Sequence, residues 1–388
     1  MNRAIAALAV GQTVAWAGLY YVFPALLLRW EQTLGWSKAE LTGAITVAVL
    51  VSALASPLAG RLIDAGRGPG MMAGCVLLGS AGLAALSAVD RLWQFYALWT
   101  VIGVALAGCL YEPCFAIVTR TRGANAKRSI IVITLAAGFA STISFPAAHG
   151  LFEVMGWRNT VICFAAFTAA IAAPLLWYGG RQLEAAYSGE NPQTTPVASR
   201  NRAFLRTAVF WFLAIGFSIG ALVHGAALHH LLPILNETGI ADDVAVIAAS
   251  FIGPMQVAGR LAVMASEKHA SNHHVAIAAF LLIGLAIVLL MFAPVSPGFL
   301  VGFIVLFGGA YGTVSIIRPV MAREILGGDA FGAKSGALAL PYLIGSASAP
   351  YVGALIWKAG GYDLMLGLMA GLAVVGCGLY MTAYRLSR

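Results

Sequence analysis

The chain has 388 residues, of which 60% are hydrophobic and only 10% are charged, with a formal net charge of +8. About a quarter of the residues are charged in a typical soluble domain, so this composition excludes a water-soluble globular protein and indicates a polytopic membrane protein. The five cysteines fall in apolar segments and form no CxxC pair, which argues against a disulfide framework and against a zinc site.

Long apolar segments recur along the whole chain, and each approaches the roughly 20 residues that a membrane-spanning helix needs. Because lipid offers backbone groups no hydrogen-bond partner, every segment is expected to be helical. We therefore predict an all-α membrane protein with twelve transmembrane helices. In chain order the predicted spans are 4–28, 40–60, 70–89, 93–117, 128–149, 158–179, 206–234, 243–264, 273–293, 298–322, 333–356 and 362–384.

The basic residues are distributed unequally between alternate connections of these spans. If the N-terminus is cytoplasmic, 17 Lys and Arg residues fall inside and 5 outside, and Arg318, within a span, completes the 23. Basic connections are retained in the cytoplasm, so both termini are predicted to be cytoplasmic. The positive charge is therefore a signal of topology, and no nucleic-acid partner is expected.

The first apolar run follows Met1, Asn2 and Arg3, a beginning that also resembles a signal peptide. The run continues through Leu28 and many spans follow, so we interpret it as the first span.

A polar and aromatic stripe marks this first span. Gln12, Trp16 and Tyr20 recur every four residues and share one helix face, where they could hold a substrate. Packing, and the common use of aromatic residues at the membrane interface, is the competing interpretation.

Glu112 is a charge well inside the fourth apolar run. Intramembrane charges are costly and usually face the protein interior or an aqueous path. A carboxyl group in a low dielectric holds its proton more tightly, so Glu112 could load and release protons near neutral pH. A fixed ion pair or a hydrogen bond to a neighbouring helix is the alternative. Gly108 and Ala105 are expected on its face, which predicts a close helix neighbour or a cavity.

The longest polar stretch lies at the middle of the chain, around 181–205, and contains Pro192 and Pro196. Its composition is typical of a linker. We predict a cytoplasmic linker that joins an N-terminal six-helix bundle, 1–180, to a C-terminal six-helix bundle, 206–388.

Polar residues also occur within the spans of the second half. Histidine in water titrates near neutral pH, so His224 could bind substrate or a proton, or could simply be hydrogen-bonded to a neighbouring helix. His229 and His230 lie nearer the outer end, where a structural role is favoured. Gln256, in the eighth span, is a further candidate for substrate contact.

Arg318 is the basic counterpart of Glu112 in the tenth span. Its guanidinium stays protonated and offers a planar fork of donors that suits a carboxylate or oxyanion. Tyr311 shares its helix face at i−7, and Tyr342 in span 11 is another candidate ligand. Two alternatives remain open: Arg318 pairs with helix carbonyls, or it pairs with Glu112 as a latch.

Four short matches occur in the same order in the two halves, at offsets between 199 and 207 residues, which indicates an internal repeat. Two parallel six-span repeats with a substrate site between them form a known transporter plan. The matched pairs are Gly60-Arg61 with Gly259-Arg260, which close spans 2 and 8; Glu112-Pro113 with Arg318-Pro319; Ala126-Lys127 with Ala333-Lys334; and Pro146 with Pro350.

Over essentially its full length the chain resembles the major facilitator superfamily. The run Gly60-Arg61-Leu62-Ile63-Asp64-Ala65-Gly66-Arg67 resembles that family's signature between spans 2 and 3, although Gly68 replaces the usual second basic residue. The resemblance implies that Arg61, Asp64 and Arg67 form a cytoplasmic conformational gate, in which a helix-end aspartate pairs with arginines and separates from them as the halves move.

Two further runs, Gly138 to Thr142 with Pro146 and Gly253 to Arg260, are similar to a bacterial branch related to monocarboxylate transporters. With this resemblance we predict proton-coupled symport of a small organic anion such as a monocarboxylate, by alternating access, and from their chemistry we assign Glu112 as proton site and Arg318 as anion site. Some bacterial relatives export toxic compounds, including arsenicals, so proton-driven efflux of a drug or arsenical is the alternative.

An enzymatic function is not expected, because no nucleophile–base pair or metal cluster is evident. The run from Gly328 to Ser335 lacks the glycine directly before lysine that a phosphate-binding loop needs. We expect no cofactor and no metal. The expected partners are a small-molecule substrate, protons and the lipid bilayer, for a monomer that crosses the bacterial inner membrane many times.

Overall fold

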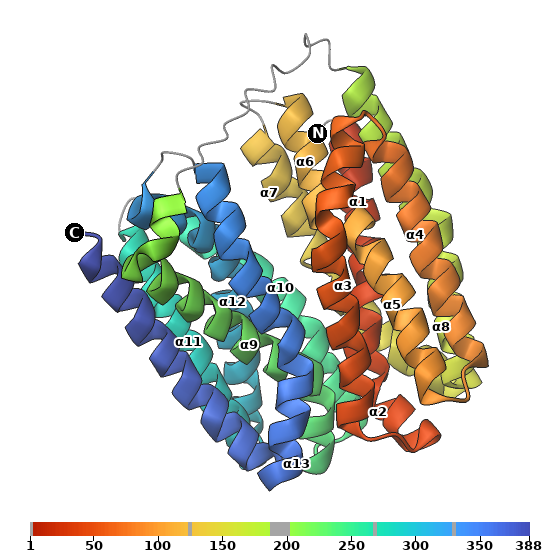
Figure 1. Ribbon diagram of the computed structural model, residues 1–388. Helices are drawn as coiled ribbons and strands as arrows, with labels where there is room; N and C mark the ends of the chain where they lie inside the picture. Colours follow the sequence, from red (N-terminus) through yellow and green to blue (C-terminus); the bar gives the residue numbers. More distant parts are fainter. Residues whose placement is uncertain (1–2, 123–125, 187–201, 267–269, 328–330) are drawn as a thin grey trace. The chain divides into compact units, whose positions relative to one another are not determined.

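The computed structural model describes residues 3–122, 126–186, 202–266, 270–327 and 331–388. Within these ranges the regular structure is helical (Figure 1), which confirms the predicted all-α membrane class. Ten helical segments of the described chain are long and apolar enough to cross a membrane. The chain divides into two compact units, Met1–Asn191 and Pro192–Arg388.

In the N-terminal unit the first span consists of α1 and α2, joined by one π-helical turn. The longest helix of this unit, α8, packs along α1 and α4, and α5 packs against α3 and α4. The bounds are α1 Arg3–Trp16, the π-helical turn Ala17–Tyr21, α2 Val22–Leu34, α3 Lys38–Asp64, α4 Gly68–Ala85, α5 Leu92–Cys109, α6 Tyr111–Arg122, α7 Ala126–Ala137 and α8 Ala140–Ala185.

In the C-terminal unit α9 packs along α13, and α12 packs against α10 and α11. The core at one end of this unit is aromatic and includes the buried Phe210, Phe217, Phe280 and Tyr380. The bounds are a short 3-10 helix Arg202–Arg206, α9 Ala208–Glu237, α10 Asp242–Ser266, α11 Asn272–Met291, α12 Pro297–Leu326 and α13 Phe331–Leu386.

Two of the helices are much longer than one bilayer crossing. At 1.5 Å per residue the 46 residues of α8 would extend about 69 Å, against about 30 Å of hydrocarbon. Each is broken at glycine: Gly156 in α8 has φ 72°, and Gly361 in α13 has φ 73°, a region that glycine adopts readily. Each break divides its helix into two arms, and the two arms correspond to the two successive spans that were predicted in that part of the chain. The total of twelve spans and the cytoplasmic termini stay predictions.

The span predicted at 93–117 is not one continuous helix. It is interrupted at Leu110, whose φ of −85° and ψ of −153° are extended, and it continues in α6 to Arg122. Pro113 is the physical reason, because proline has no N–H to donate to the carbonyl four residues earlier. Glu112 consequently lies in the first turn of a new helix, and helical structure extends further beyond it than the predicted end of the span.

Candidate functional site

The aromatic stripe of the first span forms a cluster in the N-terminal unit. The Trp16 ring lies 5.0 Å from the Tyr20 ring and 4.8 Å from the Tyr111 ring, between centroids. Tyr111 stacks in turn on Phe115 at 4.9 Å. The prediction that Trp16 and Tyr20 share a face is confirmed. Tyr111 was not among the predicted site residues. Its position directly before Glu112 is the feature of the sequence that could have pointed to it.

The π-helical turn lies within this stripe and is held by α8. The Ser144 hydroxyl donates a 2.9 Å hydrogen bond to the carbonyl of Ala17, which begins the turn. A Cβ on Gly18 would lie 1.9 Å from the hydroxyl oxygen of Thr168, so only glycine allows this approach. Single π-helical turns of this kind are frequent at functional sites.

Gln12, predicted to contact substrate, has a structural task in the broken span. Its fully buried amide nitrogen donates to the carbonyl of Cys109 at 2.8 Å and to that of Leu110 at 3.2 Å. Cys109 is four residues before Pro113, so its carbonyl lacks the usual helical donor. The side chain of Gln12 supplies that donor, and its Oε1 has no partner among the described residues.

Glu112 is exposed, beside Tyr111 in the first turn of α6. No salt bridge to it occurs within the described residues of the N-terminal unit. An ionised carboxyl facing lipid is costly, so its exposure favours an aqueous path. The predicted close neighbour is found at Gly108, where a Cβ would lie 2.3 Å from the Sγ of Cys75.

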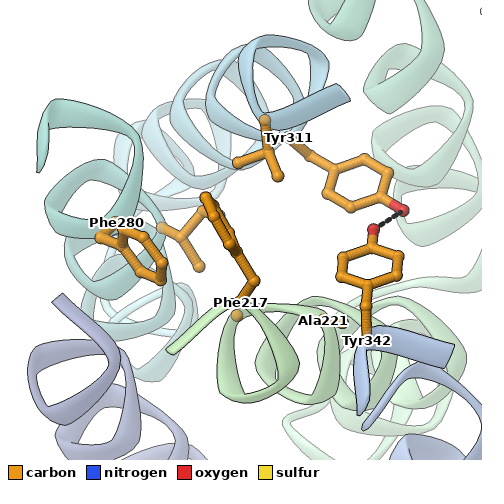
Figure 2. A pocket seen from close by; sticks show the side chains of 8 residues that line it. Phe217, Ala221, Phe280, Tyr311 and Tyr342 are labelled. Atoms are coloured by element: carbon orange, nitrogen blue, oxygen red, sulfur yellow. Dashed lines mark hydrogen bonds between the residues drawn. The ribbon is translucent and has the colours of Figure 1, made fainter. Parts of the chain in front are cut away.

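In the C-terminal unit, four predicted site residues from three helices form one chain of contacts. His224 of α9 stacks on Tyr311 of α12, with ring centroids 3.3 Å apart and planes 2° apart. The Tyr311 hydroxyl lies 3.5 Å from that of Tyr342 in α13; Figure 2 marks this contact with a dashed line. The guanidinium carbon of Arg318 lies 3.8 Å from the centre of the Tyr342 ring. The structure thus brings together His224, Tyr311, Arg318 and Tyr342.

A small apolar pocket adjoins this chain of contacts. Figure 2 shows Tyr311 and Tyr342 on one side of it and Phe217 and Phe280 on the other. Its free volume is about that of one water molecule. The pocket is therefore almost closed in this conformation, and a larger ligand enters only when its side chains separate.

Gln256 lies on α10, where that helix meets α12 at very short range. A Cβ on Gly312 would be 2.1 Å from the backbone oxygen of Gln256. The Gln256 side chain is buried, and its Nε2 has no hydrogen-bond partner among the described residues. This donor remains a candidate for substrate contact, while the backbone at this position serves helix packing.

Arg260, which the internal repeat pairs with the exposed Arg61, is buried near the end of α10. The helix α10 continues to Ser266, so Arg260 lies within it and is only 6% exposed. Its Nε donates to the hydroxyl of Ser315 at 3.3 Å, and Ser315 is three residues from Arg318. A second guanidinium group therefore lies near the chain of contacts in this unit.

The other two histidines of α9, His229 and His230, hydrogen-bond to groups on α9 and α13. His229 Nδ1 lies 2.8 Å from the carbonyl of Gly225. His230 reaches the carbonyl of Pro350 with Nε2, at 2.8 Å, and the Tyr362 hydroxyl with Nδ1, at 3.2 Å. His230 thus ties α9 to both arms of α13.

The proposed cytoplasmic gate is described in part. Arg61 and Arg67 are exposed, whereas the side chain of Asp64 lies outside the described part of the structure. Nearby, Arg120 at the end of α6 donates to the carbonyl of Ile63 and forms an ion pair with Glu184. This contact ties α6 to the ends of α3 and α8 and was missed in the sequence, where Arg120 reads as a loop residue.

Two units of apolar helices that each carry charged and polar groups within their spans are typical of a membrane transporter. Residues 8–266 match the family model described as Major Facilitator Superfamily, so the chain belongs to this superfamily of transporters and is not an enzyme. As a member of this superfamily it is a membrane protein that transports small-molecule substrates.

Two solved structures share this fold. The nucleoside transporter NupG aligns with a TM-score of 0.75 at 14% identity, over 98% of this chain and 99% of that one. A bacterial homologue of the human lysosomal transporter Spinster, in an inward-facing and occupied conformation, aligns with a TM-score of 0.65 at 16% identity, over 98% and 96%. No curated protein matches this chain significantly in sequence.

Proposed function

We propose that the protein is a secondary active transporter of the bacterial plasma membrane that moves a small organic anion together with protons, by alternating access. The observation that carries this proposal is the environment of Arg318. Its half-buried guanidinium is held over the ring of Tyr342, and no carboxylate pairs with it within the described residues of the C-terminal unit.

A permanent cation inside an apolar bundle is costly unless a counter-charge compensates it. An anionic substrate supplies that charge and can accept two parallel hydrogen bonds from the guanidinium fork. The stacked Tyr342 ring holds the guanidinium plane in place, so little rotational freedom is lost when the anion binds. Arg318 is accordingly assigned as the anion site, with Tyr311, Tyr342 and His224 around it.

Glu112 is assigned as the proton site. Its carboxyl group is exposed and unpaired within the described residues of its own unit, so a proton can reach it and leave it. Trp16, Tyr20 and Tyr111 form an aromatic cluster in the N-terminal unit, in which Tyr111 directly precedes Glu112. Arg61, Asp64 and Arg67 are assigned to the cytoplasmic gate, and the working unit is a monomer.

Reconstituted vesicles with an imposed pH gradient test these assignments. Accumulation of a labelled monocarboxylate such as lactate should follow protons inward. Glu112→Gln should abolish gradient-driven accumulation but retain exchange of internal for external substrate, since exchange needs no net proton movement. Arg318→Lys should weaken the anion affinity at least about tenfold, because lysine loses the planar fork. Glu153→Gln and Arg385→Lys, both at exposed positions, are the matched controls.

Two results would contradict the proposal. Full gradient-driven accumulation by Glu112→Gln excludes Glu112 as the proton site, and unchanged affinity in Arg318→Lys excludes bidentate anion binding. Proton-driven expulsion of a drug or of arsenite, with no organic anion transported, would instead favour the efflux alternative, in which Arg318 acts as a structural latch.

A further inference from the structure

Arg318 and the apolar pocket lie in line along α12. Tyr311 and Val314 form the wall that α12 contributes to the pocket, and Arg318 follows them at positions i+7 and i+4. Residues at these spacings share one helix face. Because Arg318 also stacks on Tyr342, which lines the pocket, the guanidinium lies at one end of this apolar space.

The opposite end of the same space is polar but carries no fixed charge. On α9, Phe217, Gly220 and Ala221 line the pocket, and His224 follows one turn later, stacked on Tyr311. His224 is 4% exposed, and its Nδ1 has no hydrogen-bond partner among the described residues. The seven residues from Tyr311 to Arg318 separate the two ends by about 10 Å along the helix.

Between these ends the side walls are mostly aromatic. Phe217 and Phe280 pack against each other on one side, with centroids 5.9 Å apart and planes at 30°, and the two tyrosine rings lie on the other side (Figure 2). The contact between the tyrosine hydroxyls, at 3.5 Å, is at the limit of a hydrogen bond and opposes separation only weakly. A flat ring that enters between these walls replaces one aromatic contact with another.

We propose that the transported anion is an aromatic carboxylate, whose carboxylate group binds Arg318 and whose ring occupies the pocket formed by Phe217, Phe280, Tyr311 and Tyr342. This inference rests on the proposed function and adds the substrate class. Ring and charge are both needed, because the walls offer an aromatic surface while the guanidinium of Arg318, stacked on Tyr342, supplies a permanent positive charge at one end.

Four probes on the full-length protein in vesicles separate the contributions. Benzoate carries ring and charge, cyclohexanecarboxylate carries a saturated ring with the same charge, acetate carries charge alone, and benzyl alcohol carries the ring alone. We expect benzoate to inhibit labelled benzoate uptake at a concentration at least about tenfold lower than acetate does. Cyclohexanecarboxylate should fall between them, and benzyl alcohol should not be transported.

Ala221→Leu fills the pocket and should lower the ratio of benzoate to acetate uptake about tenfold or more. Ala278→Leu, at an exposed position on α11, is the matched control and should leave that ratio as it is. Should Ala221→Leu not fold, the probe series on the unmodified protein decides alone.

The outcomes distinguish the two levels of the proposal. If acetate or lactate is transported with an affinity equal to or better than that of benzoate, or if cyclohexanecarboxylate equals benzoate, the aromatic class is overturned while anion transport stands. If none of the anions binds or is transported, the proposed function fails as well.

Discussion

The side-chain amide of Gln12 hydrogen-bonds to the carbonyl oxygen of Cys109, at the place where Pro113 leaves that carbonyl without a backbone donor. A residue of the first span thereby completes the hydrogen bonding of the fourth. The extended backbone of Leu110 follows directly, and the next helix begins at Tyr111 with Glu112 in its first turn. The position of the proposed proton site therefore depends on a side chain about a hundred residues away in the sequence.

Replacing Gln12 should destabilise the N-terminal unit. Gln12→Leu leaves the Cys109 carbonyl buried without a donor, which costs about 1–3 kcal/mol. Pro113→Ala restores the backbone N–H, so the double variant Gln12→Leu with Pro113→Ala should recover a large part of that loss. Thermal unfolding of the purified protein in detergent measures both effects.

The control for this pair is Gln182→Leu, which changes an exposed glutamine near the end of α8 and should leave the unfolding temperature nearly as it is. Additive losses in the double variant would show that the amide of Gln12 does not replace the missing N–H.

Tyr342 should act on anion affinity through its ring. A cation–π contact contributes about 0.5–2 kcal/mol, so Tyr342→Leu should weaken anion binding about 2- to 30-fold, whereas Tyr342→Phe should keep most of the affinity. Competition for labelled substrate uptake in vesicles measures the affinity. Tyr351→Leu, an exposed tyrosine on the same helix, is the control. Equal effects of the Phe and Leu variants at Tyr342 would exclude a role for the stacked ring.

His224 should select for a polar group at the far end of the ring. A net hydrogen bond contributes about 0.5–1.5 kcal/mol, so the unmodified protein should prefer 4-hydroxybenzoate over benzoate about 2- to 10-fold. His224→Phe keeps a ring against Tyr311 but removes the nitrogen, and should abolish the preference. His274→Phe, at an exposed site on α11, should keep it. Persistence of the preference in His224→Phe would exclude contact with this nitrogen.

The approach of α10 to α12 should not tolerate a side chain at Gly312. The Cβ of alanine there would lie 2.1 Å from the Gln256 oxygen, which is backbone and cannot rotate away. Gly312→Ala should therefore destabilise the C-terminal unit by about 1–3 kcal/mol. Gly371→Ala on α13 has open space around it and should stabilise by about 0.5–1 kcal/mol. Thermal unfolding compares the two, and equal stability would contradict the close packing.

Hydropathy predicted the location of most helices because apolar length is a property of each segment alone. The shared face of Trp16 and Tyr20 was predictable for the same reason, since helical spacing is local. Contacts between helices were not predictable from the sequence. Nothing in the sequence shows that Arg318 lies over Tyr342, because that contact depends on how α12 packs against α13.

The breaks in the helices could also be predicted only in part from the sequence. Pro113 could be seen in the sequence, but proline is tolerated in membrane helices when other groups satisfy the backbone, so the interruption at Leu110 depends on Gln12. Arg260 was placed at the close of span 8 because its sequence matches Gly60-Arg61 in the internal repeat, and this match does not reveal its burial. Its burial follows from the continuation of α10 and from Ser315 on another helix.

The π-helical turn at Ala17–Tyr21 places one more residue in the first span than uninterrupted α-helical winding would hold. The wide turn takes up this residue, so deleting one residue within it would restore α-helical winding and leave α2 facing nearly the same neighbours. An α-helix rotates by about 100° per residue, so a one-residue deletion within α1 or α2 would turn the side chains beyond it by about that angle. A deletion should therefore be tolerated best inside the turn, and a deletion on either side of it should be more damaging than most substitutions.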